Sequence, residues 1–192
     1  MLIAYIHGFL SGPNAEKASI MKRYVKEHCP QDSFEAADFP DTPKEAAIAL
    51  DAFVRARLDK ELFLVGSSMG GFFCTLLQAR FGVRCALINP CVHPQEYFED
   101  LIGPQHNDFT NRDFVLEPHM LDDLKALDRE TSKFIPSETT VYLQTGDEVL
   151  DYTKSLSFYH GAQIHVSEGG CHRYEGFESI CPEIIKFAKR EL

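Results

Sequence analysis

The feature that most constrains the fold of this chain is a Gly-x-Ser-x-Gly pattern at residues 66–70, which read Gly-Ser-Ser-Met-Gly. An apolar run at residues 62–65 precedes the pattern, and a segment that is apolar nearly all round, residues 71–80, follows it. A strand, a tight turn and a helix in this order are typical of a nucleophile elbow, which admits only very small residues two positions before and after its serine. The spacing therefore selects Ser68, and not Ser67, as the reactive serine.

Two other interpretations of this pattern exist. A glycine-rich turn without a chemical role would contain the same residues, but the flanking strand and helix disfavour it. A phosphate-binding loop is also disfavoured, because no Gly-Lys-Ser/Thr sequence follows the glycines.

Short apolar runs alternate with helical patterns along the chain. Strands are predicted at residues 2–6, 62–65, 85–88 and 141–143, and weaker ones at 33–37 and 163–166. Helices are predicted at residues 44–59, 71–80 (ending at Gly82) and 177–188. Continuous apolar runs are typical of parallel strands that are covered on both faces. The alternation predicts an α/β fold with a mostly parallel sheet and helices on both faces, in one domain of residues 1–192.

Residues 91–136 form the irregular part of the sequence. They lie between two predicted strands, mix polar turns with short amphipathic pieces at residues 96–102 and 119–127, and are longer than a usual connection. We expect this segment to be a lid or cap insertion.

Charge and cysteine content narrow the possible partners. The net charge of -10 disfavours nucleic acids and anionic membrane surfaces. The first apolar run is too short for a signal-peptide core or a bilayer span, so no membrane insertion is expected. The six cysteines show neither a Cys-x-x-Cys pair nor zinc spacing, which favours reduced thiols, no bound metal and a cytoplasmic location.

A serine nucleophile needs a histidine base and an acidic residue that orients it. In this type of fold the acid follows the serine in the sequence, and the histidine follows the acid. His172 ends a Glu-Gly-Gly-Cys-His sequence between the last predicted strand and the last helix. Asp147 follows the strand predicted at residues 141–143, and Asp151 is the second candidate for the acid. A surface-loop histidine and a turn aspartate beside glycine are the alternatives for these positions.

The oxyanion of an acyl-transfer reaction needs two backbone N–H donors. Met69, which follows the proposed nucleophile, is expected to supply one of them. Phe9, after the His-Gly turn that ends the first strand, is expected to supply the other. We interpret His7 as a structural residue.

Five segments of the chain together resemble the YqiA-type esterases, a family of small bacterial α/β-hydrolases. The segments are residues 5–9, 66–71, 88–90, 144–152 and 168–172, and they follow in the same order. The resemblance implies an esterase or thioesterase that acts on acyl substrates, with Ser68 as nucleophile, Asp147 as acid and His172 as base. Cys171 and Arg173 depart from the family pattern, in which asparagine usually precedes the histidine and a small residue often follows it.

The expected reaction is a two-step acyl transfer through an acyl-enzyme, without a metal or organic cofactor. The partner would be a small-molecule ester or thioester with a short or medium acyl chain; the sequence leaves the oligomeric state open. Arg173 could bind a carboxylate or phosphate, act on His172 through its charge, or be a solvated arginine. Candidate substrate contacts are Phe9, Leu10, Tyr97, Phe98, Phe109, Phe114 and Arg173, although aromatic residues at such positions are more often ordinary packing residues.

Two alternatives remain for the function. The same triad could hydrolyse a peptide or a C–C bond, since a fold does not determine a substrate. The chain could also be a non-catalytic binding protein that keeps the fold.

Overall fold

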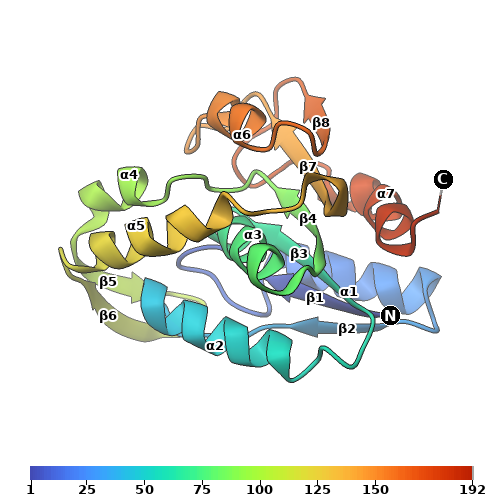
Figure 1. The fold of residues 1–192 in the computed structure, drawn as a ribbon, viewed down its shortest axis with the longest axis horizontal. Helices are drawn as coiled ribbons and strands as arrows, with labels where there is room; N and C mark the ends of the chain where they lie inside the picture. Colours follow the sequence, from blue (N-terminus) through green and yellow to red (C-terminus); the bar gives the residue numbers. More distant parts are fainter. Residues whose placement is uncertain (192) are drawn as a thin grey trace.

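A six-stranded parallel sheet forms the centre of the computed structural model, which describes residues 1–191 (Figure 1). Its strand order is β2-β1-β3-β4-β7-β8, and every neighbouring pair is parallel. The strands are β1 (Leu2–Ile6), β2 (Ser33–Ala36), β3 (Leu62–Ser67), β4 (Arg84–Ile88), β7 (Thr139–Gln144) and β8 (Gln163–Ser167). All six lie at the predicted places, which confirms the predicted fold class.

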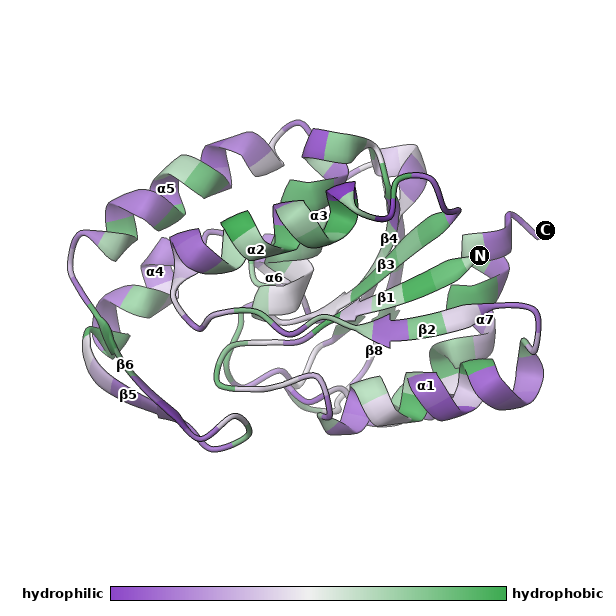
Figure 2. Ribbon diagram, turned by 90° about the horizontal axis from the view of Figure 1, so that it is seen from below, coloured by the Kyte–Doolittle hydropathy of each residue, from purple (hydrophilic) through white to green (hydrophobic). Residues whose placement is uncertain are grey.

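Helices cover both faces of this sheet, as expected for a parallel sheet (Figure 2). One face packs against α2 (Pro43–Arg55), α3 (Met69–Phe81) and α5 (Met120–Thr131), and the other against α1 (Glu16–His28) and α7 (Phe177–Lys189). Successive side chains of a strand point to opposite faces. In β1, Ala4 accordingly packs on the α3 side, and its neighbours Ile3 and Tyr5 pack on the α1 and α7 side.

Among the helices that cover the sheet, α3 is the most deeply buried. It starts one residue after Ser68, and its side chains Phe72 and Leu76 are almost completely buried between the sheet and the outer helices. Burial of each such side chain stabilises the fold by roughly 1.5–3 kcal/mol. Gly82 ends the helix in the left-handed conformation, at the predicted position. The buried helix thus holds the adjoining turn that contains Ser68 in place.

Residues 91–136 fold into several pieces outside the central sheet. They contain α4 (Gln95–Phe98), the 3-10 turn η1 (Glu99–Leu101), a hairpin of β5 (Gly103–Asn107) and β6 (Arg112–Leu116), and α5. The helix α5 packs against α2 and α3, so it belongs to the outer helical layer. Whether the other pieces act as a lid remains a prediction.

The β5–β6 hairpin was expected only as polar turns. It lies at the end of the molecule opposite the N-terminus, beyond the carboxyl end of β1 (Figure 1). The amide of Asn107 holds it there by donating to the backbone oxygen of Ser11 at 2.9 Å. The hairpin is therefore attached to the loop that follows β1.

Two helices were not predicted from the sequence, α1 and α6 (Tyr152–Phe158). In α1 only Ala18, Met21 and Val25 are buried, so the apolar stripe is narrow. In α6 the single fully buried residue is Ser155, which is polar. Both helices therefore carry a weak periodic signal.

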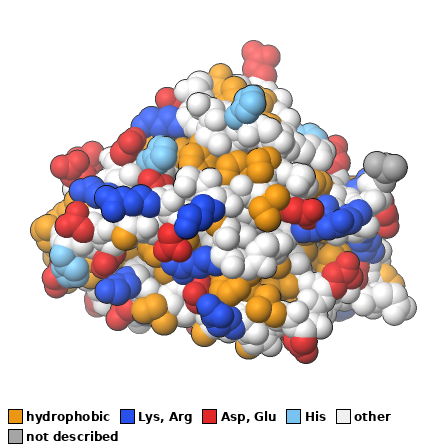
Figure 3. Space-filling view, viewed as in Figure 1, with side chains coloured by type: hydrophobic (Ala, Val, Ile, Leu, Met, Phe, Trp, Pro, Cys, Tyr) orange, Lys and Arg blue, Asp and Glu red, His pale blue; other side chains and the backbone are white. Residues whose placement is uncertain are grey.

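The outer face formed by α2, α3 and α5 mixes charges of both signs (Figure 3). Arg80 on α3 pairs with Asp51 of α2 at 2.8 Å and with Glu130 of α5 at 2.7 Å. These ion pairs connect the three helices of the layer. Within residues 1–191, each helix is too short or too polar to cross a membrane.

Candidate active site

The predicted elbow residue Ser68 lies in the turn between β3 and α3 with φ 56° and ψ −123°. A positive φ is uncommon for a residue other than glycine and costs of the order of 1–3 kcal/mol. The surroundings hold this backbone in place, because the Ser68 N–H donates to the Ile88 carbonyl at 3.0 Å. The Ser68 carbonyl in turn accepts the N–H groups of Gly71 and Cys91, at 2.9 and 3.0 Å. The side chain remains partly exposed and accessible to a substrate.

Gly66 and Gly70 meet the steric demand of this turn. A Cβ on Gly66 would collide with the backbone oxygen of Gly70. A Cβ on Gly70 would collide with the backbone oxygen of Ile6, at the end of β1. The two glycines are therefore required by close backbone approach.

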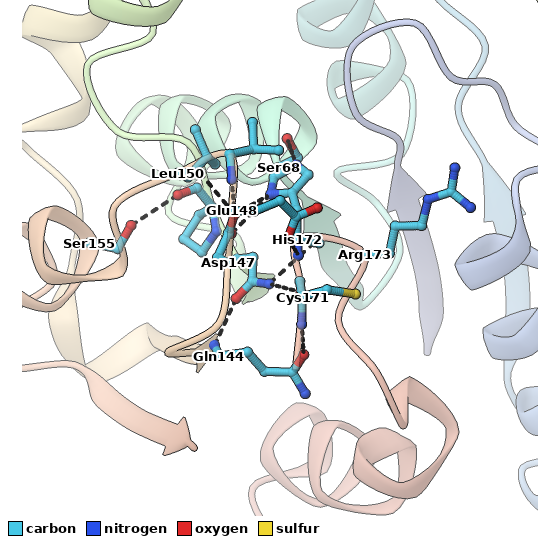
Figure 4. Close-up of polar contacts among 12 residues, drawn as sticks. Ser68, Gln144, Asp147, Glu148, Leu150, Ser155, Cys171, His172 and Arg173 are labelled. Atoms are coloured by element: carbon cyan, nitrogen blue, oxygen red, sulfur yellow. Dashed lines mark hydrogen bonds and ion pairs between the residues drawn. The ribbon is translucent and has the colours of Figure 1, made fainter. Parts of the chain in front are cut away.

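The three residues predicted as a triad form one hydrogen-bonded chain (Figure 4). The Ser68 Oγ and the His172 Nε2 lie 2.9 Å apart. The His172 Nδ1 lies 2.9 Å from one Asp147 carboxylate oxygen and 3.0 Å from the other. The Asp147 side chain is 2% exposed and that of His172 is 19% exposed, so the imidazole is the more accessible of the two. With Nδ1 protonated toward Asp147, Nε2 can accept the serine proton.

The structure places Asp147, and not Asp151, against His172. Asp147 also accepts the backbone N–H groups of Val149 and Leu150, at 2.9 and 2.8 Å, which fixes its carboxylate. Asp151 instead caps the N-terminus of α6, where it accepts the backbone N–H and the hydroxyl of Thr153. The hydrogen bond from the Thr153 hydroxyl is the main cause that lowers the pKa of Asp151.

Sequence reasoning missed the residues that hold the histidine loop. Asn89 donates its amide to the carbonyls of Cys171 and His172, at 3.0 and 3.2 Å. Glu148 accepts the His172 backbone N–H at 2.8 Å, and Gln144 accepts that of Cys171 at 3.1 Å. A signal was available, because Asn89 and Gln144 are polar residues at the carboxyl ends of buried strands, where parallel folds place their sites.

The predicted oxyanion donors approach the serine differently: Met69 follows it in the chain, and Phe9 lies near it in space. Met69 is the first residue of α3, and Phe9 lines the same cavity as Ser68. Gly8 packs so closely that an added Cβ would lie 3.3 Å from the Ser68 Cβ. Their role as N–H donors stays a prediction.

The buried His7 ring stacks on Phe39 at 4.1 Å between centroids, and its Nδ1 lies 2.9 Å from the Gly8 carbonyl. Burial lowers the pKa of His7. A neutral, stacked ring of this kind fits the structural role expected for it.

Two hollows lie near the candidate triad: Ser68 lines one of them, and its neighbour Met69 lines the other. The first, here called the polar cavity, has a volume of about 250 Å³ and is open to solvent. The second, here called the apolar pocket, has room for about one water molecule, at about 20 Å³. The polar cavity is lined by Glu16, Lys17, Ser68, Phe109, His172 and Arg173, among others; the apolar pocket is lined by His7, Phe39, Met69, Phe73 and Phe98, among others.

The candidate substrate contacts are divided between these hollows. Leu10 and Phe9 border both, Phe98 borders the apolar pocket, and Arg173 borders the polar cavity. The Tyr97 ring lies elsewhere, 5.3 Å from the Lys154 Nζ.

Phe114, another of the candidate substrate contacts, packs against Phe9. The ring of Phe114 meets that of Phe9 edge-on, with 6.0 Å between the ring centroids, so Phe114 packs behind Phe9.

Among the residues that the structure describes, no group of three or more His, Cys, Asp or Glu side chains could hold a metal ion.

The protein has the α/β-hydrolase fold, as its similarity to solved structures shows. It is similar to Est1E from Butyrivibrio proteoclasticus, with a TM-score of 0.77, 16% identity, and coverage of 99% of this chain and 87% of that one. It is also similar to the esterase domain of a Rhodothermus marinus protein (TM-score 0.71, 15% identity, 98% and 86% covered). A third similar structure is the mouse α/β hydrolase domain-containing protein 10 (TM-score 0.69, 15% identity, 98% and 90% covered).

The sequence itself matches the model of an uncharacterised protein family, UPF0227, over residues 1–189. The chain belongs to this family, the YqiA-like family, as its sequence motifs predicted.

Proposed function

We propose that the protein is a serine hydrolase that cleaves small carboxylic esters or acyl thioesters through an acyl-enzyme. The observation that carries the proposal is the chain of hydrogen bonds from Ser68 Oγ through His172 to the buried Asp147 carboxylate. A serine hydroxyl is a poor nucleophile without an adjacent base, and this arrangement supplies one.

In the first step, Ser68 Oγ attacks the carbonyl carbon as His172 Nε2 takes the hydroxyl proton. Asp147 stabilises the imidazolium that forms, because its carboxylate faces the protonated Nδ1. The backbone N–H groups of Phe9 and Met69 bind the oxyanion. His172 then returns the proton to the leaving alcohol or thiol, and the acyl group stays on Ser68.

In the second step, water replaces the leaving group. His172 takes a proton from the water as the oxygen attacks the acyl-enzyme, and the acid is released with Ser68 restored. The strained backbone of Ser68 keeps its oxygen at the carboxyl edge of the sheet in both steps.

The apolar pocket supports a short acyl group. Its volume of about 20 Å³ is far below what a long hydrocarbon chain needs. Phe73 and Phe98 occupy the space beside Met69 that a longer acyl chain would require.

The experiment that tests the proposal combines ester hydrolysis with covalent labelling. We expect the wild-type protein to hydrolyse p-nitrophenyl acetate and to form a fluorophosphonate adduct on Ser68, located by peptide mass mapping. Ser68→Ala should lose both properties while its circular dichroism spectrum is unchanged. Ser67→Ala, which alters the buried neighbouring serine, should keep the adduct.

The alternatives give different results. A folded wild-type protein without an adduct on Ser68 would support a binding protein on the same fold. An adduct without ester or thioester turnover would point to peptide or C–C bond hydrolysis by the same residues.

A further inference from the structure

The polar cavity contains two cationic side chains beside the candidate triad. Lys17 lies in the first turn of α1, and Arg173 directly follows His172. Both line the cavity that Ser68 and His172 line. The Lys17 amine also donates to the Arg173 backbone oxygen at 2.8 Å, so the two residues are held together. This concentration of positive charge contrasts with the net charge of -10 for the whole protein.

Neither of these two cations forms an ion pair with any residue that the structure describes. Within residues 1–191, neither Lys17 nor Arg173 has a carboxylate oxygen within 4.0 Å, although most arginines of the described chain do. Glu16 borders the same cavity and offsets part of their charge. Burial lowers the pKa of the Lys17 amine, and the nearby Arg173 lowers it further against the opposing effect of Glu16. A bound anion would relieve this repulsion.

The side of the ester that meets these cations follows from the reaction. His172 must return its proton to the leaving group, so the leaving group must lie on the side of Ser68 where His172 is accessible. His172 lines the polar cavity together with Ser68, whereas it does not line the small apolar pocket, which we assign to the acyl group. Figure 4 shows the Arg173 side chain extending away from Asp147, on the far side of the imidazole. The leaving group therefore enters the space that Lys17 and Arg173 border.

We propose that the natural substrate has a compact anionic leaving group, an alcohol or thiol bearing a carboxylate or phosphate, which Lys17 and Arg173 bind. The inference rests on the proposed serine-hydrolase function. In the step concerned, the bond from the acyl carbon to the leaving oxygen or sulfur breaks. The leaving atom takes the proton that His172 received from Ser68, and water later releases the acid. The two cations bind the substrate and take no part in the proton transfer.

The test uses three acetyl esters that differ in one substituent of the leaving phenol, which is anionic in two of them and neutral in the third. They are the acetyl esters of meta-hydroxybenzoate, of the neutral meta-hydroxybenzamide and of meta-hydroxyphenyl phosphate. The measured quantity is the ratio of kcat/KM between each charged ester and the amide ester, at low ionic strength. The amide is close in shape to the carboxylate, so the ratio isolates the effect of charge.

In the wild type, we expect kcat/KM for at least one charged ester to be about ten times that for the amide ester, or more. A factor of about ten is what one ordinary hydrogen bond to a charged group contributes. Arg173→Gln and Lys17→Gln should each move this ratio toward one, and Arg173→Glu should bring it below one. Arg23→Gln, which removes a positive charge from the outer surface of α1, should leave the ratio unchanged. The preferred ester shows whether the site takes a carboxylate or a phosphate.

The outcomes separate this inference from the proposed function. Equal kcat/KM values for all three esters in the wild type, with turnover lost in Ser68→Ala, would overturn the anion site and leave the hydrolase intact. Turnover that persists in Ser68→Ala would overturn the hydrolase proposal itself. A purely structural effect of Arg173→Gln would lower all three values equally, keep the ratio and so also refute the anion site.

Discussion

The side-chain oxygen of Asn89 accepts the backbone N–H of Gln144 at 2.9 Å, which connects the ends of β4 and β7. From this connection both side chains reach the loop that carries His172. Asn89 binds the carbonyls of Cys171 and His172, and Gln144 binds both the N–H and the carbonyl of Glu175. The position of the imidazole thus depends on two buried polar side chains that line neither hollow.

Replacement of Gln144 should loosen this loop. Gln144→Leu keeps the side-chain volume but removes the oxygen that accepts the N–H groups of Cys171 and Glu175. We expect kcat to fall about 10- to 100-fold, because small displacements of a catalytic group are costly. Gln78→Leu is the matched control, since Gln78 is a buried residue of α3 that binds the backbone of Ile135, away from Ser68. A similar loss of kcat in both variants, at equal loss of stability in urea unfolding, would contradict a positioning role.

The two aspartates after β7 should differ strongly in their effect on hydrolysis. Asp147→Asn puts an amide against the His172 Nδ1 and favours the wrong tautomer, so kcat/KM for p-nitrophenyl acetate should fall about 10⁴-fold. Asp151→Asn should keep most activity and change the stability little, because asparagine also caps helices well. Comparable losses of activity in the two variants would show that the acid is wrongly assigned.

The backbone strain at Ser68 predicts a conflict between stability and activity. Ser68→Gly and Ser68→Ala both remove the hydroxyl, but only glycine adopts φ 56° and ψ −123° without strain. We expect both variants to be inactive and Ser68→Gly to be more stable than Ser68→Ala by about 1 kcal/mol. Urea unfolding of the two variants measures the difference. A glycine variant less stable than the alanine variant would refute strain at this residue.

The apolar pocket should limit the acyl chain through Phe98. Its ring packs on that of Phe9 at 4.7 Å between centroids and is 5% exposed. Phe98→Ala should shift the best p-nitrophenyl ester from acetate toward butyrate or hexanoate, with a stability loss of about 3–5 kcal/mol. The ratio of kcat/KM values across the ester series is the measurement. Phe134→Ala, an aromatic residue packed against Tyr159 instead, should leave the ratio unchanged.

The thiols should differ in their reaction with iodoacetamide at pH 8. Burial raises the pKa of Cys85 and Cys181 to about 12, and raises those of Cys29, Cys74 and Cys91 as well. The thiolate is the reactive form, so these thiols stay unreactive well below their raised pKa values. Cys171 is the half-exposed cysteine and should be the first one modified in the folded protein, as peptide mass mapping would show. Faster labelling of any buried cysteine in the native protein would contradict this order.

Much of the architecture was readable from the sequence because its signals are local. The apolar runs that became β1, β3, β4 and β7 each carry their pattern within a few residues. The demand for glycine around Ser68 arises from a turn of five residues, which the sequence displays directly. The order of strand, turn and helix therefore identified the fold class and the place of the serine before any contact was known.

The tertiary structure decided what depends on residues far apart in the chain. The sequence named both Asp147 and Asp151, and only the packing of β7 against the histidine loop set one beside His172 and the other at the start of α6. Lys17 and Arg173 are 156 positions apart, and no local pattern connects them. The sequence thus determined which elements form and which residues could react. The docking of α1 and the hairpin around the strand ends determined the shape and charge of the space beside Ser68, because these are properties of long-range contacts.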